Sequence, residues 1–330
     1  MMKRFGPARV SSLLACLFAC TLLAGCVTRP DDPPELRPIE RGQLPAPTAQ
    51  LNIPGLGPCT DVADRTLSLD TSQPVNVLVH GCFGSAGRFR SLAQVLAFHG
   101  QQTACFSYND RDSLMVSSGQ LARAVEALGK QLSPARVTVI GHSQGGLVAR
   151  KALVADRPDP LDGSAQLRLV TVSAPFGGIE SARLCAEPYA RILTLGIGDL
   201  ACRAISGDKW YEITYASAFI RQPGRLHRSV TDHLKVDTDE RGSCRQFGPD
   251  GRCTKDDYVF SVEEQQYPLV NEHPGVVGVE VKAGHVEIVG DTNVRPDKLI
   301  AVLQQQGVIR PTAPERAAAL DRLLTALYGD

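Results

Sequence analysis

Residues 137–150 read VTVIGHSQGGLVAR, and this stretch decides how the rest of the chain is interpreted. Its first four residues are β-branched, which favours a buried strand, and helix-forming residues predominate after Gly145. A strand that passes directly into a helix needs a sharp turn, in which a side chain at Gly141 or Gly145 would collide with neighbouring backbone. Ser143, between them, is then held in a strained conformation with its hydroxyl above the sheet. The pattern therefore predicts that Ser143 is a nucleophile.

The segments on either side of this turn alternate between short apolar runs and stretches with helical spacing. This alternation predicts an α/β fold with a mostly parallel sheet and helices on both of its faces. Strands are expected at residues 75–79, 103–108, 137–140, 167–172, 233–236 and 276–281, and helices at 114–132, 145–155, 296–305 and 314–328. Residues 179–211 interrupt the alternation, and we interpret them as an insertion above the sheet.

Three motifs resemble those of a known superfamily. Residues 80–84 read HGCFG after the first strand, residues 141–150 read GHSQGGLVAR, and residues 174–178 read APFGG. Together they resemble bacterial lipases and the GPI-inositol-deacylase-type esterases of the α/β-hydrolase superfamily, over residues 75 to about 305. Many of these relatives have histidine where this chain has Phe176, so the surface there is expected to be more apolar.

The resemblance implies the α/β-hydrolase fold, with a mostly parallel central sheet flanked by helices and an inserted lid-like segment at about 179–211. It also implies acyl transfer from an acyl-ester substrate through a Ser-His-Asp triad. The backbone N–H groups of Cys82 and Gln144 would form the oxyanion hole. In related enzymes these donors come from the loop that corresponds to residues 80–84, here called the H-G loop, and from the residue after the nucleophile.

A nucleophilic serine needs a base, and in this fold the base follows the nucleophile and the acid along the chain. Among the seven histidines, His285 stands in an Ala-Gly-His-Val stretch just after the Val-rich strand at residues 276–281. A loop after a late strand is where a base can reach back over Ser143. His285 is therefore the favoured base, with His273 as the second choice.

The carboxylate that orients the base is open to several assignments. Residues 256–263 resemble the D-G-x-V-P-x-x-S stretch that carries the acid in many lipases, although Tyr258 and Ser261 replace its glycine and proline. Asp257 aligns with the acid and is the favoured residue. The aspartates that compete with it are Asp256, Asp237 and Asp239, of which the last two lie at the end of an expected strand.

The N-terminus has the organisation of an export signal. Three basic residues precede an uncharged, mostly apolar run at residues 10–23 that is too short to span a bilayer comfortably. It ends in Leu-Ala-Gly-Cys at residues 23–26, which resembles a bacterial lipobox, so residues 1–25 are expected to be removed and Cys26 lipidated. The absence of an aspartate after Cys26, where this chain has Val27, favours an outer-membrane location in the cell envelope.

Residues 26–58 are then expected to form a tether, because eight prolines and little apolar periodicity predict an extended, poorly packed segment. The catalytic domain is expected to cover residues 59–330. An exported compartment is oxidising, so disulfides are expected among the seven cysteines after Cys26, with Cys244–Cys253 and Cys185–Cys202 as the favoured pairs.

Composition limits the partners and cofactors. The 330 residues include 43% hydrophobic and 21% charged residues with a formal net charge of zero, which argues against nucleic acid as a partner. No C-x-x-C pair or histidine cluster predicts a metal site, and no cofactor is expected.

The sequence thus predicts a serine hydrolase of acyl esters, anchored to a membrane through Cys26. The alternatives are an acyltransferase or thioesterase with the same triad, and a non-catalytic envelope lipoprotein on a hydrolase scaffold.

Overall fold

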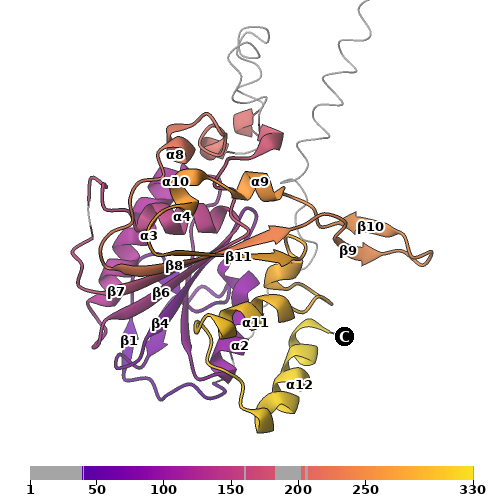
Figure 1. Cartoon of the computed structure of the whole chain (residues 1–330). Coiled ribbons are helices and arrows are strands. Elements are labelled where there is room, and N and C mark those ends of the chain that lie inside the picture. Colours follow the sequence, from indigo (N-terminus) through magenta and orange to yellow (C-terminus); the bar gives the residue numbers. More distant parts are fainter. Residues whose placement is uncertain (1–38, 40, 160, 183–201, 205–206, 330) are drawn as a thin grey trace, which may run out of the picture.

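The computed structural model of the chain describes residues 39, 41–159, 161–182, 202–204 and 207–329. Figure 1 shows a twisted central sheet with helices on both sides of it. Helices α3 and α4 cover one face, and helices α2, α11 and α12 lie at the other. Among the described residues, no helix is both long enough and apolar enough to cross a bilayer.

The strands are β1 (Ala49–Leu51), β2 (Leu56–Gly57), β3 (Leu67–Leu69), β4 (Val75–Val79), β5 (Gln102–Phe106), β6 (Arg136–His142), β7 (Gln166–Val172), β8 (Val230–Asp239), β9 (Cys244–Phe247), β10 (Cys253–Asp256) and β11 (Val276–Lys282). The α-helices are α2 (Arg90–Phe98), α3 (Leu114–Gly129), α4 (Gln144–Ala152), α8 (Ala218–Arg221), α9 (Val262–Gln265), α10 (Pro268–Asn271), α11 (Asp297–Gln305) and α12 (Ala317–Tyr328). Short 3-10 helices are η2 (Ala86–Phe89), η3 (Glu180–Ala182), η4 (Gly207–Lys209), η5 (Glu287–Val289) and η6 (Pro314–Arg316).

Seven strands form the main sheet in the order β11-β8-β7-β6-β4-β5-β2. All neighbours pair in parallel except β2, which runs antiparallel to β5 at one edge. Because all strands of this sheet except β2 run in one direction, their carboxyl ends meet along a single edge of the sheet. In open α/β sheets, ligands bind at this edge.

The core has two layers because alternate residues of each strand point to opposite faces of the sheet. On one face, strand residues pack against α3 and α4; this layer includes Val77, Val139, Leu169, Leu121 and Val148. On the other face, they pack against α2 and α11; this layer includes Leu78, Ile140, Val170, Leu96 and Leu303. Burying one such side chain stabilises the fold by about 1.5–3 kcal/mol, so the central strands are firmly fixed between the helices.

The folded region begins before Cys59, earlier than the Pro-rich composition predicts. Strand β1 pairs with β3, and β2 joins the main sheet with Leu56 only 1% exposed. A disulfide between Cys59 and Cys105 then fixes this segment beside β5. The apolar residues between the prolines therefore outweigh the tendency of the prolines to keep the segment extended and unpacked.

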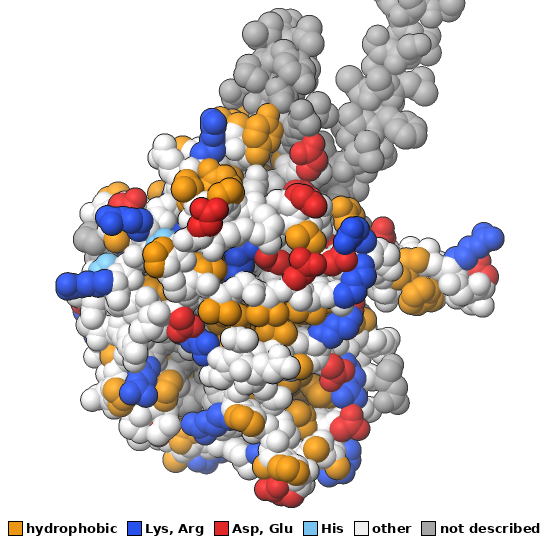
Figure 2. Space-filling model, in the orientation of Figure 1, with side chains coloured by type: hydrophobic (Ala, Val, Ile, Leu, Met, Phe, Trp, Pro, Cys, Tyr) orange, Lys and Arg blue, Asp and Glu red, His pale blue; other side chains and the backbone are white. Residues whose placement is uncertain are grey.

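An arm formed by β9 and β10 projects from the body after β8, as Figure 1 shows. The Cys244–Cys253 disulfide closes it, which confirms that predicted pairing. The predicted Cys185–Cys202 pairing involves Cys185, which lies outside the described residues. Figure 2 shows a hydrophobic side chain and a charged tip on the arm, where Phe247 is 65% exposed and Arg252 is paired with Asp250.

Candidate active site

The predicted nucleophile and base lie in loops at the carboxyl edge of the sheet. Ser143 follows β6, and His285 follows β11. The H-G loop follows β4 at the same edge. The topology thus gathers segments that are about 200 residues apart in the chain, because parallel strands end side by side.

The turn at Ser143 has the strained geometry that its sequence predicts. Ser143 has φ 56° and ψ −129°, a left-handed conformation that is rare for a residue with a side chain. A Cβ atom on Gly141 would lie 2.3 Å from the carbonyl oxygen of Gly145, and one on Gly145 would lie 2.2 Å from that of Val79. Both positions therefore require glycine, and their packing holds the turn that presents the serine.

The H-G loop packs directly against this serine. A Cβ atom on Gly81 would lie 2.9 Å from the Cβ and 3.4 Å from the Oγ of Ser143. Cys82 is the next residue, and Gln144 begins helix α4 immediately after Ser143. The two residues expected to donate their backbone N–H groups therefore flank the serine, one in each of two adjoining segments.

His285 is held by a buried carboxylate, but the carboxylate is that of Glu240. His285 Nδ1 lies 2.9 Å from Glu240 Oε1, and it also lies 2.9 Å from Ser173 Oγ. The ring of Phe260 packs edge-on against the imidazole, with the ring centroids 4.8 Å apart. Since a carboxylate only accepts hydrogen bonds, the proton of a neutral His285 lies on Nδ1, and Nε2 keeps its lone pair.

The surroundings of Glu240 favour its ionised form. Burial opposes the negative charge, but the hydrogen bond from His285 and the backbone N–H groups of Phe260 and Val259 outweigh it and lower the pKa of Glu240. Ser173 Oγ donates a further hydrogen bond of 2.8 Å. Ser173 is fully buried with φ 47°, so a strained residue at the end of β7 supports the carboxylate.

His142 joins the serine turn to the histidine loop. Its Nε2–H donates to the backbone oxygen of His285 over 2.9 Å, and the two ring centroids are 4.7 Å apart. Burial and the nearby His285 lower the pKa of His142 to about 3, so its ring is neutral.

Ser143 and His285 are 5% and 6% exposed. Within the part of the chain that the structure describes, Ser143 Oγ makes no hydrogen bond.

Asp257, the acid favoured by the sequence, supports the main chain of the histidine loop instead. Its carboxylate accepts hydrogen bonds from the backbone N–H groups of Val286 and Glu287 at 2.9–3.1 Å. A Cβ atom on Gly284 would lie 2.1 Å from Asp257 Oδ2, so glycine is required there. The structure thus differs from the expectation, because the resemblance located an acidic residue of this region but could not distinguish a side-chain contact from a backbone contact.

The other aspartates considered as the acid are also engaged elsewhere. Asp237 pairs with buried Lys235, Asp239 pairs with Arg241 and Lys282, and Asp256 accepts the backbone N–H of Tyr258. His273, the second choice for the base, precedes β11 and so lies at the opposite edge of the sheet from Ser143. Its Nε2 accepts the backbone N–H of Leu226.

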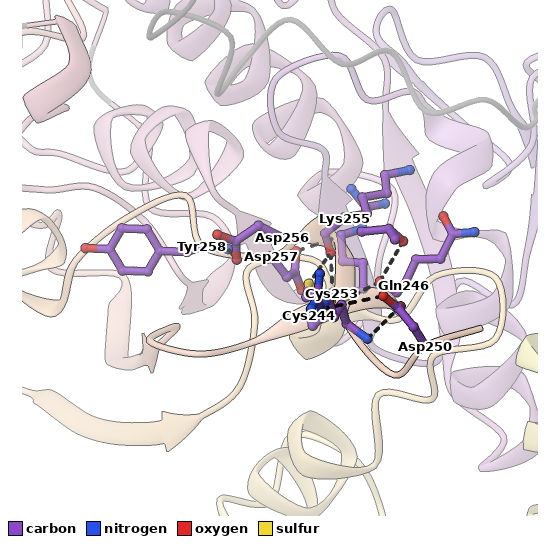
Figure 3. Close-up of a disulfide and its surroundings, with 11 residues drawn as sticks. Cys244, Gln246, Asp250, Cys253, Lys255, Asp256, Asp257 and Tyr258 are labelled. Atoms are coloured by element: carbon purple, nitrogen blue, oxygen red, sulfur yellow. Dashed lines mark hydrogen bonds and ion pairs between the residues drawn. A yellow bond between two sulfur atoms is a disulfide. The ribbon is translucent and has the colours of Figure 1, made fainter. Parts of the chain in front are cut away.

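A signal for Glu240 was present in the sequence. Glu240 follows the last residue of β8 directly, and a carboxylate in that position lies beside the loop that follows the neighbouring parallel strand β11. Figure 3 shows how the disulfide-closed arm then returns the chain: β10 ends at Asp256, and Asp257 and Tyr258 follow it at the base of the arm. Within the described ranges, no group of three His, Cys, Asp or Glu residues could hold a metal ion.

Comparisons with known proteins agree with this architecture. The family model of the alpha/beta hydrolase fold matches residues 74–165. The crystal structure of Bacillus licheniformis lipase BlEst2 in its propeptide form is similar with a TM-score of 0.51 at 16% identity, over 79% of this chain and 55% of that chain. The mature form of that lipase gives a TM-score of 0.49 at 15% identity, over 76% and 96% of the two chains.

Esterase B from Lactobacillus rhamnosis gives a TM-score of 0.49 at 10% identity, over 96% of this chain and 95% of that chain. At such low identities the likeness to solved structures concerns the fold alone. No curated protein sequence matches this chain.

Proposed function

We propose that this chain, which has the α/β-hydrolase fold, is a serine hydrolase that cleaves carboxylic esters, with Ser143 as nucleophile, His285 as base and Glu240 as acid. The observation that carries the proposal is the contact of His285 Nδ1 with the buried, ionised carboxylate of Glu240. The backbone oxygen of His285 also accepts a hydrogen bond from His142, the residue before Ser143. This is how a base is oriented beside an activated serine.

The reaction then follows from the roles of these groups. His285 Nε2 takes the proton of Ser143 while Oγ attacks the ester carbonyl, and Glu240 stabilises the imidazolium that forms. The backbone N–H groups of Cys82 and Gln144 stabilise the oxyanion. His285 returns the proton to the departing alcohol, and water, activated by the same base, hydrolyses the acyl-enzyme.

The ionised state of Glu240 supports this direction of proton transfer. Because its pKa is lowered in spite of burial, the carboxylate remains charged at neutral pH. A carboxylate at Nδ1 holds the proton of the neutral imidazole on that nitrogen, so the lone pair of Nε2 is available to take the proton of Ser143. Asp257 contributes by fixing the backbone of the loop and not by contacting the imidazole.

A labelling experiment tests the assignment of the nucleophile. A fluorophosphonate probe should modify folded protein at Ser143, and Ser143→Ala should abolish labelling and lower the kcat for p-nitrophenyl butyrate by at least about 10⁴-fold. Ser164→Ala, an exposed serine outside the site, is the matched control and should keep full labelling. Folded protein that neither reacts with the probe nor hydrolyses esters would support a non-catalytic role.

Turnover measured with different acyl acceptors and leaving groups then tests the substrate class. A panel of p-nitrophenyl esters of increasing chain length, a matching thioester and added alcohols separates an esterase from a thioesterase or an acyltransferase. We expect esters to be the best substrates and water to be the preferred acceptor. Faster turnover in the presence of an alcohol, with the alkyl ester as product, would instead assign acyl transfer.

We also propose that the chain is held at a bacterial membrane through lipidated Cys26, which lies outside the described residues. The support is the charge, apolar run and small residues that precede this cysteine. Labelled palmitate should be incorporated into the full-length protein in a bacterial host, and Cys26→Ser should abolish its incorporation. Equal recovery of both proteins from the soluble periplasmic fraction would contradict the proposed anchor.

A further inference from the structure

A lysine is buried beside the turn that carries Ser143. Lys209 is the last residue of η4, and it is only 2% exposed. A buried ammonium group is costly unless its protons find acceptors, and an apolar side chain of similar volume is often at least as stabilising in such a position. The contacts of Lys209 therefore indicate what the charge does there.

Its three N–H donors have three acceptors. Nζ lies 3.2 Å from Cys82 Sγ and 2.5 Å from Gln144 Oε1, and it donates a third hydrogen bond to the carbonyl oxygen of Asp110. The carboxylate of Asp110 lies 3.6 Å from Nζ and balances its charge. Because every proton of Lys209 is engaged within the protein, none is left for a substrate.

Two of these partners belong to the segments that flank the serine, and the third, Asp110, contacts both segments. Cys82 and Gln144 are the residues whose backbone N–H groups we assign to the oxyanion hole. The Asp110 carboxylate accepts the backbone N–H of Phe83 at 2.7 Å, and Phe83 has a left-handed φ of 53°. Gln144 Nε2 donates to the Asp110 carbonyl at 3.1 Å, so both ends of the Gln144 amide are fixed by the same network.

The segment that carries Lys209 is itself seated on this network. The backbone N–H of Asp208 donates to the carbonyl oxygen of Arg111 at 2.7 Å. A Cβ atom on Gly207, which has φ 78°, would lie 2.3 Å from the same oxygen. Glycine at position 207 therefore permits close packing of η4 on residues 110–111, and this packing directs the next two residues of the helix.

We propose that Lys209 is a positioning residue, which ties the H-G loop to the start of α4 and so holds the two oxyanion N–H donors at the spacing that the transition state requires. The inference rests on the proposed function, because it assigns a role within that oxyanion hole. A displacement of such donors by about 1 Å lowers the reaction rate by a factor of the order of 100. The role belongs to a residue of the insertion and not to the superfamily motifs at 80–84 and 141–150.

The test compares Lys209→Met with Lys130→Met, a control at an exposed lysine on the C-terminal side of α3. For p-nitrophenyl butyrate, Lys209→Met should lower kcat by about 10- to 100-fold with KM within about twofold of the wild-type value. Affinity for n-butylboronic acid, whose serine adduct places a negative oxygen in the hole, should fall by the same factor as kcat/KM. Affinity for butyramide, which binds without forming an adduct, should be unchanged.

Gln144→Leu provides a second variant in case Lys209→Met does not fold. It removes one acceptor of Lys209 and should lower boronate affinity in the same way, while the double variant loses less than the product of the two single effects. Wild-type kcat and boronate affinity in both single variants would overturn the inference. Wild-type protein that neither hydrolyses the ester nor binds the boronate would instead refute the proposed function itself, and the role of Lys209 with it.

Discussion

The turn at Ser143 and the support of His285 represent two different ways of building a site. The turn is one uninterrupted stretch, from β6 through Ser143 to α4, and glycines at fixed positions determine its geometry. The support of His285 combines three segments: the end of β8 with Glu240, the return of the arm with Asp257, and the loop after β11. Local chemistry determines the first region, and tertiary packing determines the second.

This difference explains where sequence reasoning is strong. In the turn, the residues that interact are neighbours in the chain, so their spacing encodes their contacts. In the support of His285, two carboxylates from the same part of the chain are both nearly fully buried near one histidine. One binds the ring and the other binds the backbone, and no spacing rule distinguishes these roles.

Among the changes that compare the two regions, the largest fall in kcat is expected for Glu240→Gln, with Asp257→Asn as its comparison. A glutamine at position 240 faces backbone N–H groups with one end and the imidazole with the other, so its amide favours the wrong tautomer of His285. We expect kcat to fall by about 10³- to 10⁴-fold. Asp257→Asn should keep activity within about tenfold but lower the free energy of unfolding by about 1–3 kcal/mol, because backbone donors lose a charged acceptor.

Steady-state rates with p-nitrophenyl butyrate and urea unfolding of both variants provide the measurement. A larger loss of kcat in Asp257→Asn than in Glu240→Gln would return the acid to Asp257. It would also mean that the contact at His285 Nδ1 does not identify the acid.

The second prediction concerns His142, where the two regions meet. Its pKa of about 3 lies well below the value near 6.5 of an unfolded histidine, so the unfolded chain binds one more proton between these pH values. The contribution of the neutral His142 ring to the free energy of unfolding is therefore complete above about pH 6.5, and it is lost as the pH falls towards 3. Because the ring is partly exposed, we expect a loss of about 1–2 kcal/mol between pH 7 and pH 4.5.

His142→Gln keeps a donor for the His285 carbonyl but does not titrate. Urea unfolding at pH 7 and pH 4.5 should therefore show a smaller acid destabilisation in this variant than in the wild type. Equal acid sensitivity of the two proteins would show that His142 is not kept neutral by the fold, and that the joint between the two regions carries no such linkage.

The sequence predicted the α/β-hydrolase fold and most of the central strands, because β-branched runs such as Val75–Val79 and Val276–Lys282 need only local pattern to be recognised. It placed the end of the tether too late, since burial of Leu56 depends on its pairing with distant β5. Sequence analysis considered Asp237 and Asp239, both within β8, as the acid, but it did not consider Glu240, which is one residue beyond the strand. A strand boundary that is uncertain by one or two residues is enough to hide which carboxylate leaves the sheet.

The smallest effect on catalysis is expected from opening the arm between the two carboxylates. Backbone contacts outside the disulfide hold Glu240 and Asp257: Ser243 N–H donates to the carbonyl of Glu240, Asp257 N–H donates to the carbonyl of Ser243, and His285 N–H donates to the carbonyl of Asp257. Cys244→Ser combined with Cys253→Ser should therefore change kcat by less than about threefold, although loss of the cross-link relaxes the unfolded chain and lowers stability by up to about 2–3 kcal/mol.

The double serine variant is preferable to a reducing agent, which could also act on the Cys59–Cys105 disulfide. Rates are best compared at a temperature where both proteins are fully folded, so that the lost stability does not enter the measured kcat. A fall in kcat as large as that of Glu240→Gln would mean that the closed arm, and not the hydrogen bonds at its base, positions the acid. The three-segment support of His285 would then depend on a covalent link within a single segment.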